Sequence, residues 1–257
     1  MAEQQDFLER QFGLKQHGTT VRTEFIAGLT TFLTMVYIVF VNPTILGAAG
    51  MDKGAVFVAT CLAAAVSSVV MALYANYPIA LAPGMGLNAF FAFTVVLGYK
   101  YTWQQALAAV FLSGVLFFLI SIFRIREFII NAIPRNLKFA ISAGVGLFLG
   151  IIALEQAKIV VAHPVTLVTL GPLTGKDALP ALLCLAGFVL IVALNARKVI
   201  GGTLIGILAV SLIGLPLGLA SFSGVVSLPP SLAPTLLQLD FSRTFELTFI
   251  ILSLIHI

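Results

Sequence analysis

The feature that most constrains this chain is a break in the middle of a long uncharged stretch. No charged residue lies between Gly54 and Tyr99, yet a proline and two glycines interrupt helix formation in the segment Ala82–Ala89, which also contains Asn88. Lipid cannot satisfy backbone N–H and C=O groups, so non-helical backbone at membrane depth must be buried in protein or line a cavity. The break therefore predicts either a substrate site near the bilayer midplane, as broken segments form in many transporters, or a purely structural kink.

The composition is typical of a membrane protein. Hydrophobic residues make up 60% of the chain and charged residues 9%, with a mean hydropathy of +1.10, whereas about 25% of a soluble domain is charged. We interpret the net charge of +4 as a sign of membrane orientation, and we predict no nucleic-acid partner. Cys61 and Cys184 lie in separate apolar runs, and no metal-ligand spacing is present. The sequence therefore predicts no disulfide framework, no metal site and no cofactor.

The chain contains seven apolar stretches, most of which approach or exceed the ~20 residues that a helix needs to cross a bilayer. Charged residues separate them, except that Asn76-Tyr77-Pro78 interrupts the uncharged stretch between the second and the third. The predicted spans are 25–51, 54–75, 79–97, 101–123, 139–154, 178–196 and 200–220, with an external loop or re-entrant piece at 160–175. A cytoplasmic N-terminal segment at 1–24 puts the basic connector 124–138 on the inside, in agreement with the positive-inside rule. We therefore predict a multi-pass protein of the cytoplasmic (inner) membrane.

An eighth span begins near Phe245, but only 11 residues follow Glu246. A helix needs about 20 residues to cross, so this span is expected to be truncated. Residues 252–257 also match what a common sequencing-library adapter encodes when it is translated. We therefore expect residues 252–257 to be a non-native tail and assign no function to His256.

Several motifs occur in a characteristic order along the chain. Residues 30–38 read TTFLTMVYI and are followed by Val41-Asn42-Pro43, and residues 82–90 read APGMGLNAF. Ile133-Pro134 and the sequence SAGVGLF at 142–148 follow. Together these motifs resemble the AzgA-type adenine, guanine and hypoxanthine permeases of the nucleobase–cation symporter-2 group, also called the xanthine/uracil permease family.

The resemblance implies an all-α polytopic fold of fourteen segments in two inverted repeats of seven. This chain would hold the first repeat and a truncated eighth span, with the third segment formed by a short strand and a half-helix. Segments 1–4 (25–123) would belong to a core domain and segments 5–7 (124–220) to a gate domain. Residues 221–251 would form a loop and the start of segment 8.

The resemblance also implies where the substrate binds. The expected substrate-binding residues are Gly84, Gly86, Leu87, Asn88, Ala89 and Phe90 of the third segment. Thr34 and Tyr37 are added from their spacing, since they lie one turn apart on the first helix and could face the site. The two glycines would let a purine approach the backbone closely. The Asn88 amide can both donate and accept hydrogen bonds, and Phe90 could stack on the purine ring.

Simpler interpretations exist for some of these residues. A hydroxyl such as that of Thr34 more often bonds the preceding helical turn than a substrate. Asn42 is expected to satisfy backbone that Pro43 leaves unpaired rather than to contact a ligand.

The resemblance implies a secondary active transporter, not an enzyme, that takes up purine nucleobases with a proton as the coupling ion. Its predicted partners are the purine, the proton, the lipid bilayer and a second copy in a homodimer. In the family, acidic residues of segments 8 and 10 bind the purine and couple it to the proton. Neither is present here, so this chain is expected to be an inactive fragment.

Other functions stay open from the sequence. Uracil or xanthine permeases and sulfate-type anion transporters share the fold, although an anion carrier would present a helix N-terminus or a basic residue to its substrate. No Lys or Arg lies inside a predicted span. A membrane-embedded enzyme would need paired acid–base residues at depth, and a channel would need a ring of charged or carbonyl-lining residues.

Overall fold

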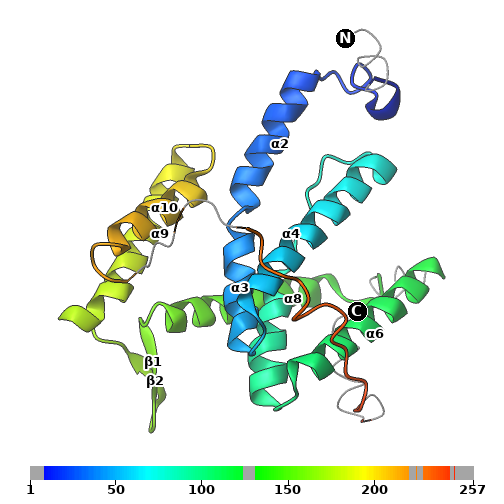
Figure 1. The fold of residues 1–257 in the computed structure, drawn as a ribbon. Helices are drawn as coiled ribbons and strands as arrows, with labels where there is room; N and C mark the ends of the chain where they lie inside the picture. The colour runs from blue at the N-terminus through cyan, green and yellow to red at the C-terminus, as the bar shows by residue number, and fades with distance from the viewer. Residues whose placement is uncertain (1–8, 124–130, 220–223, 225–227, 244–245, 247–257) are drawn as a thin grey trace. The chain divides into compact units, whose positions relative to one another are not determined.

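The computed structural model describes residues 9–123, 131–219, 224, 228–243 and 246, and these are mainly helical (Figure 1). The chain divides into two compact units. The first unit comprises residues 1–41, 59–83 and 171–228, and the second comprises 42–58, 84–170 and 229–257. The expected tail 252–257 lies outside the described residues. Apart from Glu246, so does the start of the expected eighth span.

The regular elements are of four kinds. The α-helices are α2 (Val21–Met35), α3 (Ile38–Ala48), α4 (Lys53–Val70), α5 (Met85–Ala89), α6 (Trp103–Ile122), α8 (Arg135–Gln156), α9 (Leu179–Ala196) and α10 (Gly202–Gly214). Two π-helices, η1 (Met71–Ala75) and η2 (Phe90–Gly98), continue α4 and α5, and a 3₁₀ turn, η3 (Lys176–Ala178), precedes α9. The strands are β1 (Val160–His163) and β2 (Leu167–Leu170).

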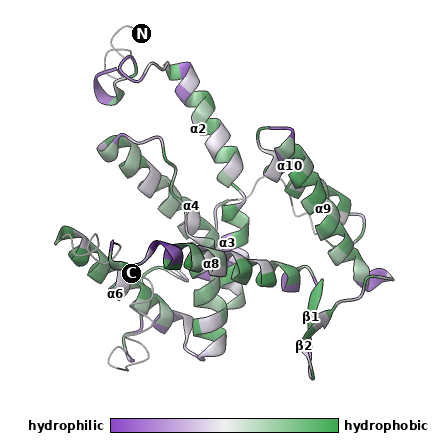
Figure 2. Ribbon diagram, turned by 180° about the vertical axis from the view of Figure 1, so that it is seen from behind, coloured by the Kyte–Doolittle hydropathy of each residue, from purple (hydrophilic) through white to green (hydrophobic). Residues whose placement is uncertain are grey.

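Among the residues that the structure describes, five helical stretches are long and apolar enough to cross a membrane. They are Val21–Ala48, Lys53–Ala75, Trp103–Ile122, Arg135–Gln156 and Lys176–Ala196. Two shorter apolar helices, Met85–Gly98 and Gly202–Gly214, coincide with the third and seventh predicted spans. Figure 2 shows hydrophobic residues along the helices and hydrophilic ones mostly at helix ends and in loops. The prediction of a polytopic, mainly helical membrane protein is confirmed, and the two-repeat organisation stays a prediction.

The first predicted span contains a break that the sequence did not reveal. The Thr20 hydroxyl caps α2 by accepting from the Thr23 N–H at 3.2 Å. The helix ends at Met35, Val36 and Tyr37 form a turn, and α3 resumes at Ile38. Neither turn residue is Gly or Pro, so no residue type marked this break.

The third segment differs from the expected strand followed by a half-helix. Asn76 adopts a left-handed conformation (φ 51°) at the end of η1, and residues 76–84 have no regular secondary structure. A strand needs a paired neighbour for its backbone groups, and the two strands of the described residues pair with each other. The expected half-helix is confirmed as α5, which η2 extends to Gly98.

The all-α expectation is wrong for the segment that we predicted to be an external or re-entrant loop at 160–175. Strands β1 and β2 pair antiparallel, with Val160 opposite Leu170 and His163 opposite Leu167. The His163 ring accepts from the backbone N–H of Thr166 at 3.2 Å and so stabilises the turn. β-Branched residues favour such a pleated pair.

The core of the second unit forms where α3, α5, η2 and α6 meet. Its buried side chains include Ile45, Ala89, Phe91 and Ala109, and Phe148 of α8 packs against them. Small alanines allow close helix approach, which membrane helices use in place of the hydrophobic effect. This core fixes the helix that carries most of the predicted site residues.

The loop that leads to the predicted eighth span is held on the start of α6. The Asp240 N–H donates to the Gln104 carbonyl at 3.3 Å, and Gln105 Nε2 donates to Ser242 Oγ at 3.1 Å. The Tyr101 hydroxyl donates to Glu246 Oε2 at 3.1 Å.

In the first unit, α9 and α10 pack side by side (Figures 1 and 2). A Cβ on Gly206 would collide with the Ile191 side chain, and one on Gly187 would lie 2.5 Å from Val210 Cγ2. These glycines therefore allow the two helices to touch, as small residues do at membrane-helix interfaces.

Candidate functional site

The broken third segment presents one buried polar contact in the second unit. Asn88 Nδ2, on α5, donates to Asn42 Oδ1, on α3, at 2.6 Å. Asn42 is only 3% exposed, and Asn88 is half-buried. The backbone N–H of Asn88 donates to the Gly84 carbonyl at 3.2 Å, in the first turn of α5. The structure thus holds the Asn88 amide by its nitrogen at one end.

The other end of the Asn88 amide is available. A side-chain amide has two N–H donors and a carbonyl with two lone pairs. Within the described residues, the Asn88 side chain makes the bond to Asn42 and no other. One N–H and the Oδ1 acceptor of Asn88 therefore remain for a ligand.

The two glycines of the motif have different surroundings. A Cβ on Gly84 would meet no atom within 4 Å, and the residue is exposed. A Cβ on Gly86 would lie 3.0 Å from Val145 Cγ1 of α8. Gly84 therefore fits the expected open approach to the backbone, whereas the small size of Gly86 is explained by helix packing.

The remaining predicted residues of this segment divide between surface and core. Leu87 is 48% exposed, whereas Ala89 is fully buried. Phe90 is half-buried and packs against the core of the second unit. That packing gives Phe90 a structural role, and its stacking on a purine stays a prediction.

Thr34 and Tyr37 belong to the first unit. The Thr34 hydroxyl donates to the Thr31 carbonyl at 2.7 Å, which is the bond within the helix that we gave as the simpler interpretation. Tyr37 is half-buried in the turn between α2 and α3, and its carbonyl accepts from the N–H groups of Phe40 and Val41.

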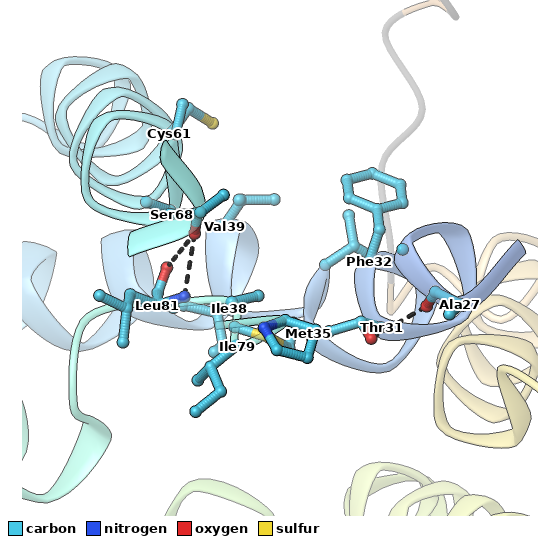
Figure 3. Close-up of a pocket in the computed structure, with 18 of the residues that line it drawn as sticks. Ala27, Thr31, Phe32, Met35, Ile38, Val39, Cys61, Ser68, Ile79 and Leu81 are labelled. Carbon is cyan, nitrogen blue, oxygen red and sulfur yellow. Dashed lines mark hydrogen bonds between the residues drawn. The ribbon is translucent and has the colours of Figure 1, made fainter. Parts of the chain in front are cut away.

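The first unit also contains a pocket of about 490 Å³, within the ~300–1,000 Å³ range typical of small-molecule sites. Figure 3 shows it between α2, α4 and the irregular segment before the motif. It is lined mainly by apolar groups, among them Met35, Ile38, Cys61, Ile79 and Leu81, and by the polar side chains Glu24, Thr31, Thr60, Ser68 and Tyr77. None of the eight predicted site residues lines it, although Ala82, at the start of the motif, does.

Ser68 fixes the irregular wall of this pocket. The Leu81 N–H donates to Ser68 Oγ at 2.9 Å, and that hydroxyl donates back to the Leu81 carbonyl at 3.3 Å (Figure 3). One side chain thus pairs both backbone groups of a residue outside any helix, as backbone at membrane depth requires.

A second pocket, of about 470 Å³, lies toward the N-terminal segment of the same unit. It shares Glu24, Ala72, Tyr77 and Pro78 with the first pocket. The Glu24 carboxylate accepts from the Thr19 hydroxyl at 2.7 Å. The two pockets are therefore contiguous along Glu24 and Tyr77.

Comparison with known proteins decides the family. A model of the Permease family, named for xanthine and uracil permeases, matches residues 22–257, which is most of the chain. This chain belongs to that permease family. The expected resemblance to nucleobase–cation symporter-2 purine permeases is confirmed, and the relatives are named as permeases, which are transporters rather than enzymes.

Three relatives illustrate the similarity. The adenine permease AdeP of Escherichia coli is 49% identical over 95% of this chain and 54% of its own length. The putative permease MJ0326 of Methanocaldococcus jannaschii is 50% identical over 94% of this chain and 55% of its own. The guanine/hypoxanthine permease PbuG of Bacillus subtilis is 46% identical over 87% and 52%. The chain spans about half the length of the curated relatives it matches.

Sequence reasoning missed two polar residues, one at the contact with Asn88 and one in the wall of the first pocket. Asn42 was expected only to satisfy backbone near Pro43, and Ser68 was not considered. Both are polar residues in uncharged, apolar stretches, and such residues usually have a specific partner because an unsatisfied polar group is costly in lipid. That signal was present in the sequence, although it could not name the partners.

Proposed function

We propose that the complete protein takes up purine nucleobases, namely adenine, guanine or hypoxanthine, across the cytoplasmic membrane. We propose that this chain contributes the third-segment part of the substrate site. The names of the relatives support this substrate class, since they include adenine permeases and guanine/hypoxanthine permeases. The orientation with a cytoplasmic N-terminus, proton coupling and a homodimer stay predictions that accompany this proposal.

The observation that carries the proposal is the Asn88 amide, held at 2.6 Å by Asn42 at the helix that follows the break. When the N–H anti to Oδ1 makes this bond, the other N–H and Oδ1 stand side by side as a donor and an acceptor. A purine edge also presents a donor next to an acceptor, so the two can pair through two parallel hydrogen bonds, as Asn does with adenine in DNA. A uniformly apolar or basic surface could not offer this match.

We propose that the proton-coupling carboxylates belong to the rest of the protein. An ionisable residue inside a membrane segment is the usual proton relay. In the described part of the chain, every Asp and Glu lies in a loop or in an end turn of a helix. Glu24 is in the first turn of α2, and Glu155 is near the end of α8.

The test of the site is Asn88→Ala in the complete protein. An unpaired polar edge on a buried purine costs ~1–3 kcal/mol, which corresponds to roughly 5- to 150-fold weaker binding. Uptake of radiolabelled adenine, guanine and hypoxanthine would be measured beside the amount of protein in the membrane. Thr94→Ala is the matched control, because Thr94 is also half-buried but lies farther along η2. Wild-type affinity of a correctly inserted Asn88→Ala protein for every purine would refute the site.

A second test addresses the chain alone. Vesicles that carry only the 257-residue chain should show no saturable purine uptake, because we expect the coupling carboxylates and the facing half of the site to lie elsewhere in the complete protein. Saturable uptake above that of empty vesicles would show that the chain is a transporter by itself.

A further inference from the structure

We propose that Asn42 determines whether the site prefers 6-amino or 6-oxo purines, by holding the Asn88 amide in one orientation. Asn42 acts as a positioning residue and makes no contact with the substrate. This inference rests on the proposed function of Asn88 and adds to it a physical basis for substrate preference.

The contact between the two amides joins segments that are far apart in the sequence. Asn42 and Asn88 are 46 residues apart, yet their side chains meet at 2.6 Å. Asn42 lies on α3 beside the buried Pro43 and Ile45, so its own position is fixed by the core of the second unit. Asn88 is half-buried on the short helix α5, directly after the irregular segment.

The direction of this bond gives the Asn88 amide a polarity. Its nitrogen donates to Asn42 Oδ1, so its carbonyl oxygen occupies the other position. A half-turn of the amide would place the Asn88 oxygen against the Asn42 oxygen, and two acceptors cannot form a hydrogen bond. With the Asn42 amide unchanged, the half-turn therefore loses the bond between the two side chains, which disfavours the turned state.

A fixed amide can distinguish the two purine classes. A 6-amino purine presents a donor at its 6-amino group and an acceptor at N1. A 6-oxo purine presents the reverse, an acceptor at O6 and a donor at N1–H. In one binding pose, an amide of given polarity pairs with only one of these patterns. A site that leaves buried polar groups unpaired with the wrong substrate rejects it strongly. An amide free to turn would accept both patterns.

The experiment measures dissociation constants of radiolabelled adenine and hypoxanthine for the purified complete protein and its variants. Asn42→Leu removes the acceptor at similar volume. We expect the ratio of the two constants to move toward one by about 2- to 12-fold, the value of one net hydrogen bond. Asn42→Asp keeps an acceptor oxygen in either protonation state, so it should retain the wild-type preference and thereby rescue the Leu variant.

A double-mutant cycle separates positioning from a structural role. In the Asn88→Ala background, Asn42→Leu should change neither constant further, because no amide remains to be oriented. Equal effects of Asn42→Leu with and without Asn88 would overturn the proposal, as would an unchanged ratio in Asn42→Leu. If Asn42→Leu does not fold, Asn42→Ala, which also lacks an acceptor, is compared with Asn42→Asp instead. Failure of the proposed function itself would differ, since Asn88→Ala alone would then leave both constants unchanged.

Discussion

Ser68 offers a sharp test of how the irregular segment before the motif is held in place. Ser68→Ala removes the partner of the Leu81 N–H (2.9 Å) and of its carbonyl (3.3 Å). Within the described residues, the Leu81 N–H donates to Ser68 and to no other group. An unsatisfied buried donor costs about 1–3 kcal/mol. Leu81 is half-buried, so we expect the lower part of that range, about 1–2 kcal/mol.

This cost should appear as local opening rather than as global unfolding. At 1.4 kcal/mol per factor of ten, amide hydrogen exchange at Leu81 should become roughly 5- to 30-fold faster. The assay is hydrogen exchange of the complete protein in detergent, followed in peptides that cover residues 77–83.

The adjacent Ser67 is the matched control. Its hydroxyl donates to the Ala63 carbonyl at 2.6 Å within α4, so Ser67→Ala removes a side-chain bond but frees no irregular backbone. Exchange in residues 77–83 should not change in this variant. Equal exchange rates in the wild type and in Ser68→Ala would show that the reasoning is wrong, because the serine would then not be holding the segment.

Two further predictions concern topology and helix packing. In a cysteine-free background, Thr169→Cys on the exposed strand β2 should react with an impermeant reagent added outside intact cells. Asn136→Cys should not react, because the positive-inside rule places it in the cytoplasm. Labelling of position 136 from outside would show that the orientation is reversed. Gly206→Val should lower the thermal stability of the protein, because its side chain would collide with Ile191 on α9 and overpacking costs ~1–3 kcal/mol. Gly144→Val, where a Cβ meets nothing within 4 Å, should have little effect, and equal losses in the two variants would contradict the α9–α10 packing.

Several parts of the structure could be predicted from residue types. The scarcity of charge predicted membrane helices, and the five long apolar helices agree. The proline and glycines at 83–86 predicted a break, because proline lacks an N–H and glycine favours no helix. Asn88 stood out as a polar residue beside that break. These inferences needed only local chemistry, which the sequence contains in full.

Other parts of the structure could not be predicted from residue types. The turn at Val36–Tyr37 contains no helix breaker, and the hairpin at 160–170 is a short apolar run that periodicity cannot distinguish from a helix or loop. The predicted strand before α5 needed a neighbouring strand, which the sequence of one segment cannot supply. In each case the backbone conformation depends on contacts from outside the segment.

The sequence by itself determined that this chain is a set of membrane helices and that the third segment breaks at residues 83–86, because charge, proline and glycine act on their immediate surroundings. Only the tertiary structure decided which polar groups meet. Asn42 pairs with Asn88 across 46 residues, and Ser68 pairs with the backbone of Leu81 across 13. In an apolar environment each such group must find a partner. Which partner it finds is set by how the helices pack, and no single segment encodes that.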